Sequence, residues 1–192
     1  MRNHLLTTII TLSLLFTLAH SHGGVTSPQA RTVGPAMKAA CGEQVFNNLN
    51  SNALGPIEQL QQIGTSQKDF DATACELSLC KGLKFEDNSN NVQQFTAGQV
   101  VPFKVEIQAK HTGKANVSVV GTASNEVLGD MLVRFDVYAS TATEVPKNQT
   151  EFDVTMPDVG AQCGEAGKCV VQWWWDSEEA KQTYMSCVDF VM

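Results

Sequence analysis

Hydrophobic and polar residues alternate along the second half of the chain. From Val101 to Ile107 every second residue is apolar, which is the pattern of a strand with one buried face. The same alternation, or a short β-branched or aromatic run, recurs at 115–120, 131–139, 152–156, 170–175 and 183–191. Turn-rich stretches separate these runs. The pattern predicts an all-β fold, an antiparallel β-sandwich of the immunoglobulin-like or fibronectin type.

The first half of the chain carries helix-forming residues instead. They fall at 35–50 and 57–62, and Gly42 interrupts the first of these segments. We therefore expect short helices and long loops before the sandwich. The length of residues 22–192 suits one ordinary domain with a core of its own.

The first 21 residues have the pattern of a secretory signal peptide. Arg2 supplies a positive charge, residues 5–18 are apolar apart from Thr and Ser, and residues 19–21 (AHS) form a small-x-small cleavage site. Cleavage after Ser21 makes His22 the first residue of a secreted, extracellular protein. The alternative is an uncleaved membrane anchor, which the shortness of the apolar stretch disfavours.

Charge excludes some classes of partner. Arg2 is the only charged residue of the signal segment, so its removal moves the formal net charge from −7 to −8. The remaining basic residues are scattered, whereas nucleic acids and anionic membranes require a clustered positive face. We expect neither as a partner, and a neutral polymer or small molecule fits better. We also expect the protein to be a monomer.

Six cysteines follow the cleavage site, and an even number in a secreted chain predicts three disulfides. Sequence leaves their pairing open, and short separations favour two local bridges. A zinc site is disfavoured because the chain has no Cys-x2-Cys pair. The expected pairs are Cys75–Cys80, Cys163–Cys169 and, with the remaining cysteines, Cys41–Cys187.

Two sequons are possible glycosylation sites, one at Asn116 and one at Asn148. Asn116 falls in a predicted strand. Asn148 is therefore the better candidate.

Cleavage would leave two histidines, His22 and His111. A histidine at the first position offers its α-amine and ring Nδ1 to one metal as a chelate, which no internal histidine can do. A second imidazole completes three neutral nitrogens, a set that suits a single copper ion. The amine, with an ordinary pKa of about 8, must lose a proton to bind. The alternatives are a chance residue after the cleavage site and an ordinary surface or core histidine.

Three segments resemble lytic polysaccharide monooxygenases. Residues 22–28 (HGGVTSP) look like the opening of these enzymes, and 111–119 (HTGKANVSV) is similar to the second-histidine loop of the branch with chitin-binding type-4 domains. Residues 182–189 (QTYMSCVD) resemble the Gln-x-Tyr-x-x-Cys strand of the fungal cellulose-active branch. Over residues 22–192 the pattern is most similar to the fungal auxiliary activity family sixteen.

The resemblance implies roles for individual residues. His22 and His111 would form the histidine brace, with Tyr184 in the axial position beside copper. Gln182 would hydrogen-bond an oxygen species without binding the metal. The alternatives are a core-facing aromatic residue at Tyr184 and an ordinary polar strand residue at Gln182.

The resemblance also implies an activity, the oxidative cleavage of a polysaccharide. Such an enzyme needs an external electron donor and hydrogen peroxide or dioxygen. The Gln-x-Tyr strand favours cellulose, and the loop of His111 makes chitin the second choice. Two other classes remain: a brace protein that binds copper without cleaving polymer, for copper acquisition or peroxide generation, and a structural, disulfide-rich wall protein.

Trp173, Trp174 and Trp175 suggest a sugar-stacking platform, but alternation sends the middle ring to the opposite face of a strand. Packing in the core is therefore the favoured role for this run. Contact with a polymer is expected instead around the copper, at Lys110, Thr112 and Lys114 and in the loops of residues 43–95.

Overall fold

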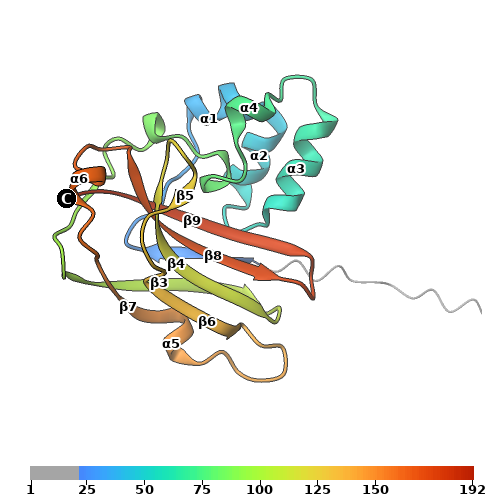
Figure 1. Cartoon of the computed structure of the whole chain (residues 1–192). Coiled ribbons are helices and arrows are strands. Elements are labelled where there is room, and N and C mark those ends of the chain that lie inside the picture. Colours follow the sequence, from blue (N-terminus) through green and yellow to red (C-terminus); the bar gives the residue numbers. More distant parts are fainter. Residues whose placement is uncertain (1–21) are drawn as a thin grey trace, which may run out of the picture.

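The computed structural model describes residues 22–192, so the predicted signal peptide and its cleavage site lie outside the described residues. Two β-sheets form a sandwich (Figure 1). The smaller sheet has the strand order β1-β3-β7 and consists of β1 (His22–Ser27), β3 (Val100–Ala109) and β7 (Glu151–Thr155). Strand β1, which begins at the predicted first residue of the mature protein, was not among the predicted strands.

The larger sheet has six strands in the order β2-β9-β8-β4-β5, with β6 also paired to β4. All its pairings are antiparallel except the short β2–β9 pair. The run at 101–107 falls on β3, and every other run of the sequence pattern falls on a strand of the larger sheet or on β7, so the predicted sandwich is confirmed. The strands are β2 (Gln93–Gln94), β4 (Gly113–Gly121), β5 (Glu126–Val127), β6 (Val133–Tyr138), β8 (Cys169–Ser177) and β9 (Gln182–Val191).

Helices cover the outer face of the larger sheet. Figure 1 shows α1 to α4 gathered on one side of the sandwich. The helix-forming segment at 35–50 forms two short helices, as its interruption by Gly42 indicated, and Gly42 between them has a φ of +82°, a conformation that glycine adopts without strain. The bounds are α1 (Pro35–Cys41), α2 (Glu43–Ser51), α3 (Ile57–Ser66), α4 (Ala72–Cys75), η1 (Cys80–Gly82), η2 (Phe85–Asp87), α5 (Lys147–Thr150) and α6 (Gly160–Cys163). Among the described residues, no helix has the length and apolar character that crossing a bilayer demands.

The hydrophobic residues form two cores, one on each face of the larger sheet. Trp173 and Trp175 lie fully buried between the two sheets, while the intervening Trp174 packs against the helical side. The predicted division of the three rings by strand alternation is therefore confirmed. Strand β9 divides in the same way, because Tyr184 belongs to the core between the sheets and Met185 to the helical one.

The structure corrects two of the predicted disulfides. Cys163–Cys169 is present, whereas the predictions of Cys75–Cys80 and Cys41–Cys187 were wrong. Short separation along the chain was a poor guide, because α4 packs against α1 and η1 packs against β9. The bonds are Cys41–Cys75, Cys80–Cys187 and Cys163–Cys169.

The two sequons occupy different environments. Asn116 is half-buried within β4, and Asn148 is exposed in α5. Occupancy of either sequon stays a prediction.

A buried ion pair ties the segment after β1 to the larger sheet. The Arg31 guanidinium donates to both carboxylate oxygens of Asp189 on β9, each at 2.7 Å, and to the carbonyl oxygen of Leu83 at 2.9 Å. The side chains of Arg31 and Asp189 are 4% and 0% exposed. Two parallel bonds with full burial make this pair sensitive to the loss of either partner.

Replacing Arg31 with Met should lower the free energy of unfolding by about 3–5 kcal/mol, because Asp189 would keep a buried and uncompensated charge. Arg134→Met is the matched control, since the Arg134–Asp136 pair is 68% and 72% exposed. The control should change stability by less than about 1 kcal/mol. Denaturant unfolding of both variants measures the difference, and equal losses would contradict the assignment.

Candidate metal centre

Strand pairing brings the two histidines of the described chain to one end of the smaller sheet. In the antiparallel β1–β3 pair, His22 lies opposite Ala109. His111 follows Ala109 by two residues, so its Cα lies within about 8 Å of that of Ala109, since consecutive Cα atoms are about 3.8 Å apart. Both histidines are half-buried. Residues 89 positions apart in sequence thus lie at the same end of the sandwich.

Neighbouring loops hold the backbone on both sides of His111. Lys110 Nζ donates to the carbonyl oxygen of Thr143 at 2.7 Å. On the other side, the Thr112 amide donates to the Glu179 carboxylate at 3.0 Å, and Ser177 Oγ donates to the Thr112 carbonyl oxygen at 3.0 Å. The turn that carries His111 is therefore fixed by the loop after β6 and by the end of the β8–β9 hairpin.

Strand β9 brings Gln182 and Tyr184 toward the same end. Alternation puts both on the face of β9 that also carries Ser186, whose hydroxyl accepts from the Val25 amide of β1 at 3.0 Å. Tyr184 is fully buried, and its phenol donates a hydrogen bond to the side-chain oxygen of Gln182. Gly23, next to His22, lies against the Trp175 ring that stacks on Tyr184, so the start of β1 lies near the Tyr184 end of β9.

Trp175 is the contact shared by all three segments. Its ring stacks on Tyr184, its partner across the β8–β9 pair, with centroids 4.4 Å apart. A Cβ on Gly23 would lie 3.0 Å from the Trp175 ring, and one on Gly113 would lie 2.8 Å from its Nε1. Glycines next to His22 and near His111 thus let both backbones approach one indole. The sequence pattern favours packing for Trp175 but carries no signal that these glycines contact its ring.

The residues at this edge fit a copper ion held by nitrogen ligands. Two histidine-bearing segments lie there, and β1 begins at the residue whose α-amine cleavage would release. Within residues 22–192 no group of three or more His, Cys, Asp or Glu side chains is placed to hold a metal. A brace needs only two such side chains, since its third nitrogen comes from the backbone.

The three predicted polymer-contact residues differ in exposure and in their hydrogen bonds to the protein. Lys114 is exposed, whereas Lys110 and Thr112 bond to loops of the protein itself, the latter also through a 3.1 Å contact with the Thr141 hydroxyl. These bonds give Lys110 and Thr112 a part in holding the His111 turn. Contact of any of the three with a polymer stays a prediction.

Comparison with known proteins gives one family match. The family described as "Lytic polysaccharide mono-oxygenase, cellulose-degrading" matches residues 22–190. No curated protein matches the chain significantly.

Several solved structures resemble the chain at low identity. A copper complex of the cellulose-active lytic polysaccharide monooxygenase CelS2 has 15% identity and a TM-score of 0.45, covering 88% of this chain and 98% of its own. A lytic polysaccharide monooxygenase from Streptomyces lividans has 11% identity and a TM-score of 0.42, covering 91% and 83%. A chitin-binding domain from Burkholderia pseudomallei has 10% identity and a TM-score of 0.46, covering 89% and 98%.

Gly113→Ala should destabilise the protein by about 1–3 kcal/mol, as overpacking does. The new Cβ would lie 2.1 Å from the backbone oxygen of Asp176, which cannot move without shifting β8. Gly160→Ala is the control, because its Cβ would meet nothing nearer than Met192 Cβ at 3.8 Å. Thermal unfolding of the metal-free proteins compares the two variants, and a Gly113→Ala protein as stable as the control would refute this close approach.

Proposed function

The chain belongs to the family of lytic polysaccharide mono-oxygenases, which cleave polysaccharides oxidatively, and on that premise we propose that it is a secreted, copper-dependent enzyme acting on cellulose. Cleavage after Ser21 would release the α-amine of His22. That amine, the His22 ring and the His111 ring would hold one copper ion. When bound, copper supplies the one-electron redox chemistry by which peroxide or dioxygen oxidises a sugar C–H bond.

The pairing of His22 with Ala109 in the β1–β3 register is the observation that carries this proposal. It brings the start of the mature chain beside the turn of His111. A histidine that merely followed a cleavage site would not be expected at the same end of the sandwich as the only other histidine of residues 22–192, which supports the proposal. A structural wall protein therefore gives a poorer account of this edge.

Tyr184 and Gln182 bound the inner side of the site. The ring of Tyr184 is buried and stacked on Trp175, and it would lie beside the copper held by the two histidines. Gln182 orients the phenol by accepting its hydrogen bond. Its amide N–H2 is then the end that can donate to an oxidant or to substrate at the open side.

Cellulose is the proposed substrate because the matching family is described as cellulose-degrading and because 182–189 carries the Gln-x-Tyr strand. Lys114 is exposed and the two histidines are half-buried at one end of the sandwich, and this exposure supports contact with an extended polymer there. Chitin is the substrate that the experiments below must separate from cellulose.

The mature protein beginning at His22 should bind one copper ion. A protein that retains Ser21 before His22 should bind copper at least about 100-fold more weakly, because the nitrogen of His22 is then part of a peptide bond. This loss exceeds the one expected when a residue that only orients a ligand is replaced. His111→Ala should weaken binding as well, and Lys147→Ala, at an exposed position of α5, serves as the unaffected control. Isothermal titration gives the stoichiometry and affinities. Equal binding with and without Ser21 would overturn the brace.

The copper-loaded mature protein, given a reductant and hydrogen peroxide, should release oxidised oligosaccharides from cellulose. Mass spectrometry of products from cellulose and from chitin identifies the polymer, with His111→Ala as the inactive control. Products from chitin alone would overturn the substrate assignment. Tight copper binding without products from either polymer would assign the chain to copper handling or peroxide generation instead.

A further inference from the structure

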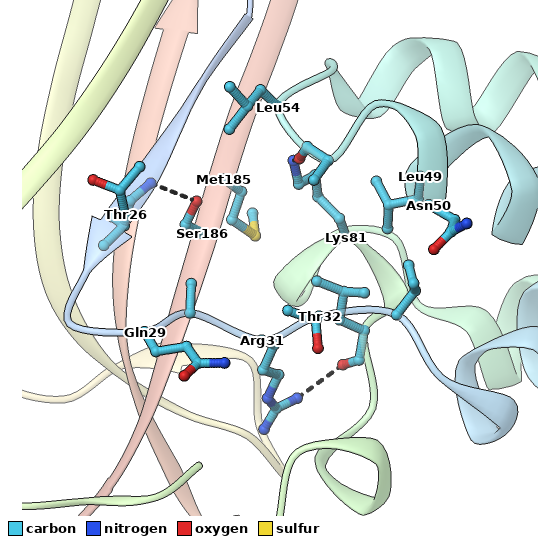
Figure 2. Close-up of a pocket in the computed structure, with 15 residues that line it drawn as sticks. Thr26, Gln29, Arg31, Thr32, Leu49, Asn50, Leu54, Lys81, Met185 and Ser186 are labelled. Carbon is cyan, nitrogen blue, oxygen red and sulfur yellow. Dashed lines mark hydrogen bonds between the residues drawn. The ribbon is translucent and has the colours of Figure 1, made fainter.

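Lys81 is a lysine in a place where lysines are rare. It is 2% exposed and lines a cavity of about 340 Å³ between the segment that follows β1 and the helical layer. Figure 2 shows Leu54 at the upper end of this cavity and Arg31 at its lower end, with Lys81 between the sheet and α2. Burial lowers the pKa of Lys81 to about 8. None of the ion pairs among residues 22–192 includes it.

The Lys81 ammonium holds one turn of the chain. Its Nζ donates to the carbonyl oxygen of Ala53 at 2.6 Å and to that of Gly55 at 3.2 Å. These carbonyls flank Leu54 in the connection between α2 and α3. Hydrogen bonds from a charged donor are stronger than those between neutral groups, so the turn is held more firmly than a neutral side chain could hold it.

The same turn holds the start of β1. The carbonyl oxygen of Leu54 accepts from the Gly23 amide at 3.0 Å. The Leu54 side chain packs on the next residue, since a Cβ on Gly24 would lie 2.8 Å from Leu54 Cδ2. Beyond its pairing with β3, the peptide after His22 is therefore anchored by a turn whose neighbouring carbonyls Lys81 binds.

The backbone of Lys81 is itself tied to β9. Its neighbour Cys80 is bonded to Cys187, three residues after Tyr184. Cys80 and Lys81 have φ angles of +52° and +57°, a region that residues other than glycine seldom adopt. Such conformations persist where the surroundings impose them, often at functional sites. The disulfide thus sets the ammonium at a fixed place relative to the strand that carries Tyr184 and Gln182.

We propose that Lys81 is a positioning residue for the copper site: through the turn at Leu54 it fixes the backbone of Gly23, and so the place where His22 presents its amine and ring. The inference rests on the proposed function, because it assigns a role toward the same metal. Both hydrogen bonds of the Lys81 ammonium go to the connection between α2 and α3, so its effect on the site would pass through that turn.

The chemistry of the side chain separates this role from simple packing. Burying an ammonium without a carboxylate costs free energy, and an apolar side chain of similar length would avoid that cost. Such a side chain could donate to neither carbonyl, however. A residue needed only to fill space would leave Gly23 and copper binding unchanged when its charge is removed.

The test uses the mature protein beginning at His22 and the variant Lys81→Met, which keeps the length and removes the donors. Lys84→Met is the matched control, because Lys84 also donates to a backbone carbonyl, that of Ala74, away from β1. Two readouts are taken, the hydrogen exchange of the Gly23 amide in the metal-free protein, and the copper affinity with the Cu(II) electron paramagnetic resonance spectrum.

In Lys81→Met the Gly23 amide should exchange at least about tenfold faster, while the amides of the central β4–β8 pair keep their protection. Copper affinity should fall by about 10–100-fold, the usual effect of losing a residue that orients a ligand, and the Cu(II) spectrum should change. Lys84→Met should match the wild type in both readouts. Lys81→Arg, which keeps a charged donor, should recover part of the affinity.

Unchanged Gly23 exchange and unchanged copper affinity in Lys81→Met would overturn the inference while leaving the proposed function intact. A wild-type protein that binds no copper would overturn both. If Lys81→Met does not fold, Lys81→Gln takes its place, because it keeps one neutral donor. A smaller loss of protection at the Gly23 amide is then expected, and a Lys81→Gln protein with the same protection as the wild type would count against the inference.

Discussion

The close packing of Trp175 is the constraint on which the candidate site depends. One indole stacks on Tyr184 and lies against the backbones near His22 and His111, where a Cβ at Gly113 would clash and a Cβ at Gly23 would be in tight contact with the ring. A side chain at Gly23 or Gly113 would push one of these segments away from the ring. Because the indole is fully buried between the sheets, it cannot move to accommodate such a change. Order in the core thus extends directly to the backbones of the histidines.

Around this contact, a disulfide and an ion pair link other parts of the chain to strand β9 of the larger sheet. The Cys80–Cys187 bond joins η1 to β9, and the Arg31–Asp189 pair joins the segment after β1 to the same strand. Strand β9 therefore carries Tyr184 on one face and the attachments of the helical layer along the rest of its length. The helical layer in turn supplies the Leu54 turn that anchors Gly23. The part of the chain rich in loops and helices helps to build the site rather than merely covering the sheet.

At several points this arrangement holds a group in a defined position at a cost in the free energy of unfolding. A lysine is buried without a carboxylate, and two consecutive residues other than glycine hold a left-handed backbone. Each costs free energy that an apolar or relaxed alternative would save. The family to which the chain belongs performs oxidative chemistry, for which ligand placement matters more than a small gain in stability. The strained and charged groups lie on the helical side of the larger sheet.

Local patterning determined much of this protein. Alternation predicted β3, β6 and β7, short apolar runs predicted β4, β8 and β9, and the two histidines left after cleavage named the candidate ligands. These features depend on the preferences of neighbouring residues, which sequence carries directly. The opposite orientation of Trp174 followed for the same reason.

Only the tertiary structure decided which distant segments meet. The pairing of β1 with β3, the bonds Cys41–Cys75 and Cys80–Cys187, and the contacts of Trp175 and Lys81 all join residues far apart in sequence. Proximity along the chain wrongly favoured Cys75–Cys80, because the packing of α4 on α1 and of η1 on β9 carries the two sulfurs to different partners. The sequence thus identified the histidines, whereas the pairing of β1 with β3 placed their segments at one end of the sandwich, because long-range contacts leave no local pattern in the sequence.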